Sequence, residues 1–386
     1  MEYKKGKKMN FQTYPFEKLN KLLEDIKPNK DYEAVSLTIG EPQFETPLFI
    51  QNELKNTTTL LNKYPKSAGE DYLKQSQINF VKNRFNIDLD QNEIIPTFGT
   101  REVLFNFPQF FLFDKQNPTI AFTNPFYQIY EGAAIASKAD VIYINLTKEN
   151  NFIAKLNEDD LQKVDLVILN YPNNPTSATI DIDTLVWWVK KSLEYNFVII
   201  NDECYSELYF DDSKKPYSLL EACIKANNPT FKNSLVLNSI SKRSSAPGLR
   251  SGFIAGDKTI LKEYMKYRTY IGCAVPLPIQ KAASIAWNDE NHVKIFRDFY
   301  KQNFTLAKNI LNIEPPEATF YIWLKVEDEL IFTKELYKQY NIKVLPGSFL
   351  GRDGIGKGYV RIALVYDPSK TETILKRLKQ FLNTFN

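Results

Sequence analysis

Short apolar runs alternate with helix-type patterns from about residue 94 onward in this 386-residue chain. Residues 166–169 (Leu-Val-Ile-Leu) form a continuous apolar run, which is typical of a strand that is buried on both faces of a parallel sheet. The segments between such runs place apolar residues at helical spacing, as Val103, Leu104 and Phe107 do. This alternation predicts an α/β fold whose strands pack between helices.

The pattern differs at both ends of the chain. Residues 16–26 show helical spacing that ends at Pro28, and a long helix followed by short strands and helices is expected beyond about residue 288. We expect a smaller C-terminal α/β domain packed with the N-terminal arm. The predicted division is a flexible tail (1–8), an N-terminal arm joining the small domain (9–47), a large domain (48–287) and a small C-terminal domain (288–386).

Composition narrows the possible functions. A formal net charge of +3 on 386 residues gives no reason to expect nucleic acid or a membrane as partner. The three cysteines lack metal-ligand spacing, and the single histidine, His292, argues against a histidine-rich metal site or a Ser/His/Asp triad. We therefore expect no metal. Because no signal peptide or run of about 18 apolar residues is present, we also expect a cytoplasmic protein.

The segment Ser239–Gly252 carries the clearest chemical signal. It follows the apolar run 235–237 and contains Ser241, Lys242 and, eight residues after the lysine, Arg250. Serine hydroxyls and a guanidinium are good phosphate donors, and a lysine near other cations has a lowered pKa that suits it to form a Schiff base. The alternative from composition alone is a solvated surface loop.

Other polar residues follow apolar runs in the same way. Asp202 ends the run 197–201, and a carboxylate there is costly unless it has a partner. Gly99, Thr100 and Arg101 precede a helix and suit an anion, although an ordinary helix start with Thr100 as cap is the alternative. Arg361 lies between apolar residues of a predicted strand; taken alone, this favours an edge strand with the arginine in solvent over an arginine buried at an anion.

Three strings in this sequence resemble motifs of the class I/II aminotransferases, which are pyridoxal 5'-phosphate (PLP) enzymes of fold type I. They are L-T-x-G-E-P-x-F-x-T-P at 37–47, N-x-P-N-N-P-T at 170–176 and S-x-S-K-x(4)-P-G-x-R-x-G at 239–252. The resemblance implies a large domain with a mostly parallel seven-stranded sheet, plus a smaller α/β domain. The sequence departs from the family pattern at Ser177, where glycine is usual, and we expect only a small adjustment of the backbone there.

The resemblance also implies roles for individual residues. Lys242 would bind PLP and carry the proton, Asp202 would keep the pyridine nitrogen protonated, and Tyr205 and Asn174 would hydrogen-bond the phenolic oxygen. Tyr127 would stack on the ring, and Tyr64 would reach the cofactor phosphate of the other subunit in a homodimer. The other implied cofactor contacts are Gly99, Thr100, Arg101, Ser239, Ser241 and Arg250, and the implied substrate contacts are Gly40, Asn174, Arg361 and Arg101.

The strings at 241–253, 272–276 and 344–352 are similar to those of N-succinyldiaminopimelate aminotransferases of lysine biosynthesis. That similarity implies glutamate as amino donor and N-succinyl-2-amino-6-ketopimelate as acceptor. The alternatives are an aspartate or other acidic or aromatic amino-acid aminotransferase, or a PLP-dependent C–S lyase on the same fold. A non-enzymatic PLP-sensing regulatory module is a remote alternative, because the near-balanced charge and the short arm leave no place for a DNA-binding domain.

Overall fold

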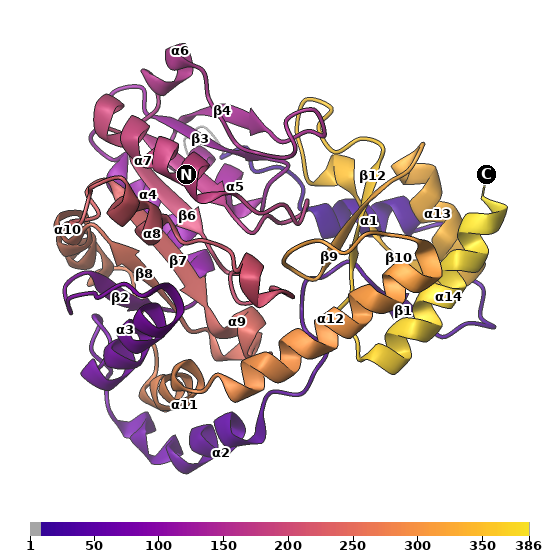
Figure 1. Cartoon of the computed structure of the whole chain (residues 1–386), viewed down its shortest axis with the longest axis horizontal. Helices are drawn as coiled ribbons and strands as arrows, with labels where there is room; N and C mark the ends of the chain where they lie inside the picture. Colours follow the sequence, from indigo (N-terminus) through magenta and orange to yellow (C-terminus); the bar gives the residue numbers. More distant parts are fainter. Residues whose placement is uncertain (1–8, 386) are drawn as a thin grey trace, which may run out of the picture.

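The computed structural model describes residues 9–385, so the predicted tail 1–8 lies outside the described residues. Its centre is a seven-stranded sheet in the order β2-β8-β7-β6-β5-β3-β4 (Figure 1). All neighbouring strands run parallel except at β8, which is antiparallel to both β2 and β7. The prediction of a mostly parallel seven-stranded sheet is therefore confirmed. The strands are β2 (Ile94–Thr97), β3 (Thr119–Asn124), β4 (Asp140–Asn145), β5 (Leu166–Asn170), β6 (Val198–Asp202), β7 (Ser234–Ser239) and β8 (Gly252–Gly256).

The central strands are apolar throughout because both faces of the sheet are covered. In β5, Val167 and Leu169 belong to one core while Leu166 and Ile168 belong to the other. Side chains alternate between the two faces of a strand, so a strand buried on both faces needs an unbroken apolar run. The first core packs against α3 (Asp71–Phe85), α7 (Ile182–Tyr195), α8 (Leu219–Lys225) and α11 (Leu277–Asn288), and the second against α4 (Thr100–Phe111), α5 (Ile129–Ala136) and α10 (Lys258–Arg268).

The C-terminal part has its own core around a smaller sheet. The helix α12 (Asn291–Leu311) runs from the region of the large sheet to this part of the molecule (Figure 1). The smaller sheet has the order β11-β12-β9, and its core also includes residues of α13 and α14. The elements are β9 (Tyr321–Lys325), α13 (Glu329–Tyr340), β10 (Ile342–Lys343), β11 (Leu345–Pro346), β12 (Tyr359–Ala363) and α14 (Pro368–Thr384).

The N-terminal segment packs on this C-terminal part. β1 (Val35–Ser36) pairs in parallel with β10, and Leu19 and Leu23 of α1 (Pro15–Leu23) share a core with Leu345 and Leu350. The bounds of the predicted domains stay a prediction. Between α1 and α3 lie α2 (Leu48–Asn56) and the 3-10 helix Thr58–Asn62. Short helices elsewhere are α6 (Glu158–Leu161), α9 (Ile240–Arg243) and the 3-10 helices Asp212–Lys214, Pro247–Leu249 and Gly347–Phe349.

Two further observations bear on the sequence predictions. β12 is the middle strand of its sheet and Arg361 is only 4% exposed, so the edge-strand interpretation of this arginine is wrong. The apolar neighbours of Arg361 pointed to a strand but carried no information on its place in the sheet. No helix within residues 9–385 combines the length and hydropathy that a membrane span requires.

Candidate active site

A cavity of about 460 Å³ lies where the parallel strands of the large sheet end. The carboxyl ends of parallel strands meet at one edge of a sheet, so the polar residues after each strand converge there. The sequence-predicted residues that line the cavity are Gly40, Thr100, Arg101, Tyr127, Asn174, Asp202, Tyr205, Ser239, Ser241, Lys242, Arg250 and Arg361. Gly99 lies beside it, against Arg250, whereas Tyr64 is fully exposed and is not brought to the cavity of its own chain.

Lys242 lies on α9, the single helical turn that follows β7. Ser239 begins this turn because its hydroxyl accepts a hydrogen bond from the backbone N–H of Ser241 at 3.1 Å. The Lys242 side chain points into the cavity and its ammonium donates to the carbonyl of Gly40. Burial lowers the pKa of Lys242 from 10.5 to about 8. With a pKa of about 8, roughly a tenth of the amine is deprotonated at pH 7 and the rest is ammonium.

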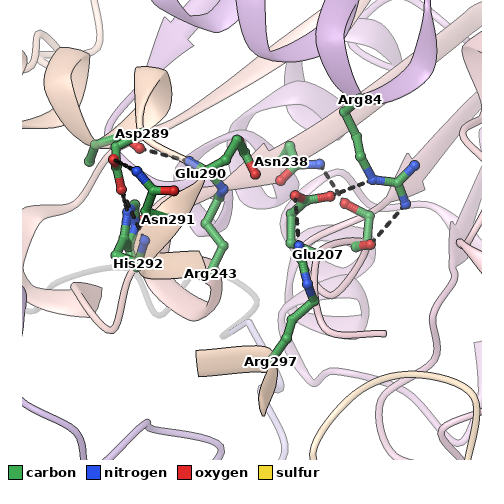
Figure 2. A network of polar contacts seen from close by, with 12 residues as sticks. Arg84, Glu207, Asn238, Arg243, Asp289, Glu290, Asn291, His292 and Arg297 are labelled. Carbon is green, nitrogen blue, oxygen red and sulfur yellow. Dashed lines mark hydrogen bonds and ion pairs between the residues drawn. The ribbon is translucent and has the colours of Figure 1, made fainter. Parts of the chain in front are cut away.

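The buried side chain of Arg243 fixes the chain immediately after Lys242 (Figure 2). Arg243 is 1% exposed, donates to the Ala286 carbonyl at 2.9 Å and forms an ion pair with Glu290. Its guanidinium also lies over two aromatic rings, those of Phe80 and Trp287, at 4.9 and 5.1 Å from their centres. Arg243 thus anchors the lysine segment to α11 and to the start of α12.

His292 adds a second anchor next to the first. Its Nε2 lies 2.9 Å from the Ser244 hydroxyl and its Nδ1 lies 2.5 Å from a carboxylate oxygen of Asp289. Figure 2 shows His292 and Asp289 beside the Arg243–Glu290 pair. The three residues resemble a Ser/His/Asp triad, but Ser244 is wholly buried and is not among the residues that line the cavity. Their contacts hold the backbone in place.

Hydroxyls and a guanidinium gather where α4 begins. Ser239 Oγ lies 2.8 Å from Ser241 Oγ, and Arg250 donates to the Pro247 carbonyl at 2.9 Å. Gly99 has a positive φ of 73°, which glycine adopts without strain, and a Cβ there would lie 2.1 Å from an Arg250 nitrogen, so a larger residue would displace this guanidinium. Gly99, not Thr100, is the N-cap of α4, so Thr100 as the cap is wrong; its hydroxyl lies 3.2 Å from the Cys204 sulfur instead.

Asp202 lies at the end of β6, on the floor of the cavity. Its oxygens accept hydrogen bonds from the Tyr130 hydroxyl at 3.0 Å and from the Cys204 backbone N–H at 3.3 Å. Both donors are neutral, and burial raises the pKa of the Asp202 carboxyl above its ordinary value. A buried carboxyl in this state would be stabilised as a carboxylate by a cationic ligand in the cavity.

Arg361 enters the cavity from β12. It donates to the side-chain oxygen of Asn174 at 2.6 Å and to the Thr38 carbonyl at 2.5 Å, and its guanidinium lies 4.5 Å from the ring centre of Tyr321. Its Nε is buried and has no hydrogen-bond partner within residues 9–385. A planar guanidinium that is held at several points is well suited to bind a carboxylate.

Tyr205 and Tyr321 form a pair on the same wall of the cavity. Their hydroxyls lie 2.8 Å apart, and the Tyr321 hydroxyl lies against Gly40. A Cβ on Gly40 would be 1.7 Å from that hydroxyl, which explains why glycine is needed there. The predicted contact of Gly40 with the substrate stays a prediction, and the structure adds a packing reason for glycine at this position.

Arg101 and Tyr127 form a separate polar group in the cavity. Arg101 Nε donates to the Tyr127 hydroxyl at 2.5 Å, and its guanidinium lies 5.6 Å from the Tyr127 ring centre. Tyr14 and Phe16, at the start of α1, also line the cavity. The predicted stacking role of Tyr127 on the cofactor stays a prediction.

Sequence reasoning missed several residues of this site. Tyr130 hydrogen-bonds Asp202 and Tyr321 hydrogen-bonds Tyr205. Asn170 links Asp202 to Asn174, because its side chain donates to the Asp202 carbonyl at 2.9 Å and accepts from the Asn174 N–H at 2.9 Å. Asn170 opens the N-x-P-N-N-P-T string and could have been found there. The two tyrosines give no comparable signal in a chain that is 14% aromatic.

The cavity fits PLP on its own chemistry. An amine with a lowered pKa, a buried carboxyl without a cationic donor and a hydroxyl–guanidinium cluster at the N-terminus of α4 match the aldehyde, the pyridine nitrogen and the phosphate. Lys242, Asp202 and the Ser239–Ser241–Arg250 cluster are the residues that would hold these three groups.

Comparison with known proteins shows which family the whole chain resembles. The family described as aminotransferase class I and II matches residues 32–378. The chain is 30% identical to the LL-diaminopimelate aminotransferase of Natranaerobius thermophilus over 97% of this chain and 98% of that protein. In structure it is similar to aminotransferase AspB of Helicobacter pylori 26695, with a TM-score of 0.94 and 52% identity over 97% of this chain and all of that one. An aminotransferase of Neisseria meningitidis Z2491 follows, with a TM-score of 0.92 and 39% identity over 96% and 98% of the two chains.

Proposed function

Because the chain belongs to the class I and II aminotransferases, a PLP-dependent family that acts on amino and keto acids, we propose that it transfers the amino group of glutamate to a keto acid with several carboxylates. The acceptor we propose is N-succinyl-2-amino-6-ketopimelate. The motifs at 241–253 and 344–352 support this acceptor, and so do the three arginines Arg101, Arg250 and Arg361 that line one cavity. With one arginine at the phosphate and one at the α-carboxylate, Arg101 is available for the distal acid group.

Each step of the transfer has a residue that suits it. When bound, PLP supplies a carbonyl that takes up the amine and a ring that accepts the electron pair of Cα. Lys242 removes the proton from the substrate Cα and returns one in the second half-reaction, for which its lowered pKa is suited. Asp202 would hold a proton at the pyridine nitrogen, and Tyr205 would donate to the phenolic oxygen.

Substrate orientation depends on Arg361 and Arg101. Arg361 would bind the α-carboxylate with two parallel hydrogen bonds, in place of those it makes to Asn174 and the Thr38 carbonyl. Arg101 would meet the distal carboxylate, since its contact with the Tyr127 hydroxyl leaves other N–H donors of the guanidinium. A substrate with acid groups at both ends would be held at both of them.

A panel of amino donors and keto acids tests this function. The absorbance of bound PLP should change when glutamate is added and return when the succinylated keto acid follows. Lys242→Ala should abolish turnover and the absorption of lysine-bound PLP. Release of ammonia and pyruvate in place of keto-acid formation would favour a C–S lyase, and turnover of the Lys242→Ala protein at a comparable rate would contradict the role of Lys242.

The names of the relatives support a second candidate substrate, LL-diaminopimelate without the succinyl group. The relatives from Natranaerobius thermophilus and Maridesulfovibrio salexigens are both called LL-diaminopimelate aminotransferases. The panel should therefore include LL-diaminopimelate as amino donor with 2-oxoglutarate as acceptor. Comparing kcat/KM for LL-diaminopimelate and for its N-succinyl derivative, both as amino donors to 2-oxoglutarate, decides between the two substrates.

We also propose that the protein works as a homodimer in which Tyr64 serves the partner's site. Tyr64 is fully exposed and Leu61, in the same segment, is 71% exposed, as expected for side chains that a second copy covers. Mixing subunits tests this. A Tyr64→Ala subunit keeps its Lys242, so pairing it with a Lys242→Ala subunit that supplies Tyr64 should restore one active site per mixed dimer. Mixtures that stay inactive would contradict the exchange of Tyr64.

A further inference from the structure

Two buried residues outside the predicted site have unusual backbone conformations and contact each other. Ser177 has a φ of 62° and Thr319 a φ of 74°, and they are 5% and 0% exposed. Positive φ is rare for any residue other than glycine, and it is an outlier for a β-branched residue such as threonine. Strain of this kind persists only where the surrounding structure enforces it, and it gathers at functional sites.

Their hydroxyls close a ring of hydrogen bonds around the backbone of Tyr321. The Tyr321 N–H donates to the Thr319 hydroxyl at 3.0 Å, and the hydroxyls of Thr319 and Ser177 lie 2.6 Å apart. The Ser177 hydroxyl donates to the Tyr321 carbonyl at 2.9 Å. Because each hydroxyl has one proton, the only consistent order runs from the Tyr321 N–H through Thr319 and Ser177 to the Tyr321 carbonyl.

The ring joins two parts of the fold. Ser177 follows β5 of the large sheet, and its N–H donates to the Asn173 carbonyl at 2.9 Å. Thr319 precedes β9 of the small sheet, and its N–H donates to the Leu208 carbonyl at 2.8 Å. The backbone of Tyr321, which lines the cavity, is therefore held by the segment that follows β5 and by the segment that precedes β9.

Tyr321 touches three residues of the site. Its ring lies under the Arg361 guanidinium at 4.5 Å, its hydroxyl is 2.8 Å from that of Tyr205, and the same hydroxyl lies against Gly40. A shift of the Tyr321 backbone would therefore move the surface on which Arg361 rests.

We propose that Ser177 and Thr319 are positioning residues that act through Tyr321 to set the carboxylate-binding geometry of Arg361. The proposal rests on the function proposed above. The serine that replaces the family's usual glycine at position 177 supplies the hydroxyl that closes the ring, and glycine would leave the Thr319 hydroxyl and the Tyr321 carbonyl without it.

Binding of glutarate to the PLP-loaded protein tests this without turnover. Glutarate has two carboxylates and neither an amine nor a keto group, so its affinity reports on carboxylate binding alone. Loss of one hydrogen bond in the ring should raise the dissociation constant about tenfold. We expect this for Ser177→Gly, Ser177→Ala and Thr319→Val, while Thr319→Ser, which keeps the hydroxyl, should bind as the wild type does.

Ser177→Gly separates positioning from folding. Glycine adopts positive φ without strain, and this gain offsets part of the free energy that the lost hydrogen bonds cost. The variant should therefore still unfold in one cooperative transition in urea, yet it should bind glutarate more weakly. Thr333→Val is the matched control, since Thr333 is buried and its hydroxyl donates to the Glu329 carbonyl within α13. Its affinity for glutarate should not change.

The outcomes are distinct. If the wild type exchanges amino groups and Ser177→Gly binds glutarate as tightly as the wild type, the ring does not position Arg361 and the proposal is wrong. If Thr319→Ser and Thr319→Val weaken binding equally, the hydroxyl is not the cause and the proposal is again wrong. If the wild type neither binds glutarate nor exchanges amino groups, the proposed function itself fails, and this inference fails with it.

Discussion

Replacing Lys242 by methionine should stabilise the cofactor-free protein while it abolishes turnover. The Lys242 side chain lies on the floor of the cavity, and burial lowers its pKa from 10.5 to about 8. At neutral pH the folded protein therefore carries an ammonium in a place that disfavours its charge. A pKa that falls this far costs the folded state about 3 kcal/mol, and contact with the open cavity reduces the expected gain to about 1–3 kcal/mol.

The pH dependence of this gain follows from the two pKa values. Below pH 8 the lysine is protonated in both the folded and the unfolded chain, so the folded state bears the full cost. Between pH 8 and 10.5 the unfolded chain keeps its proton while the folded chain has lost it, so the wild type gains up to about 1.4 kcal/mol of stability per pH unit relative to the variant. Above pH 10.5 the difference that arises from this charge disappears.

Urea unfolding of both cofactor-free proteins at pH 7 and pH 10 measures the effect. The protein concentration must be equal throughout, because a dimer unfolds in a concentration-dependent way. All other titrating groups are common to both proteins and cancel in the difference. Lys190→Met, at an exposed position of α7, is the control and should give no pH-dependent gain. An advantage of Lys242→Met that is equal at pH 7 and pH 10, or a wild type that is more stable at pH 7, would refute the buried-ammonium reasoning.

Three further substitutions test the neighbouring parts of the site. Arg361→Lys should raise the KM for glutamate about 10- to 100-fold in steady-state assays, because lysine cannot make two parallel bonds to a carboxylate; an unchanged KM would remove this arginine from carboxylate binding. Tyr64→Phe should weaken PLP binding about five- to tenfold, followed by the absorbance of the bound cofactor, and equal affinity would argue against a phosphate contact. Gly40→Ala should lower the free energy of unfolding by about 1–3 kcal/mol in urea, because the added methyl displaces the Tyr321 hydroxyl from Tyr205; full stability would show that the wall of the cavity adapts.

Much of the large sheet could be predicted from the sequence because its signals are local. An unbroken apolar run such as 166–169 must be buried on both faces, whatever the rest of the chain does. The polar residue at the end of each run also follows from order along the chain, and parallel strands bring those ends to one edge. The family resemblance predicted Asp202 and Lys242 at one cofactor, and the structure shows that they follow the neighbouring strands β6 and β7.

Residues whose roles depend on contacts between distant segments give no local signal in the sequence. Arg361 looked like a surface residue when taken alone because its sequence gives its strand but not the place of that strand in the sheet. Tyr130 and Tyr321 are ordinary aromatic residues in the sequence, and only the fold brings their hydroxyls to Asp202 and Tyr205.

Position 177 shows most clearly which information lies in the sequence and which only in the tertiary structure. The sequence by itself determined the order of strands and helices along the chain, the polar residues that follow the apolar runs and the chemistry that a lysine, an aspartate and a phosphate-type loop can perform. It also showed that serine stands where glycine is usual, but it gave that serine no role. Only the tertiary structure brought Ser177 to Thr319, 142 residues away, and closed their hydrogen bonds around Tyr321. Hydrogen bonds between hydroxyls require distances below about 3 Å, and only packing of the two sheets against each other sets such distances.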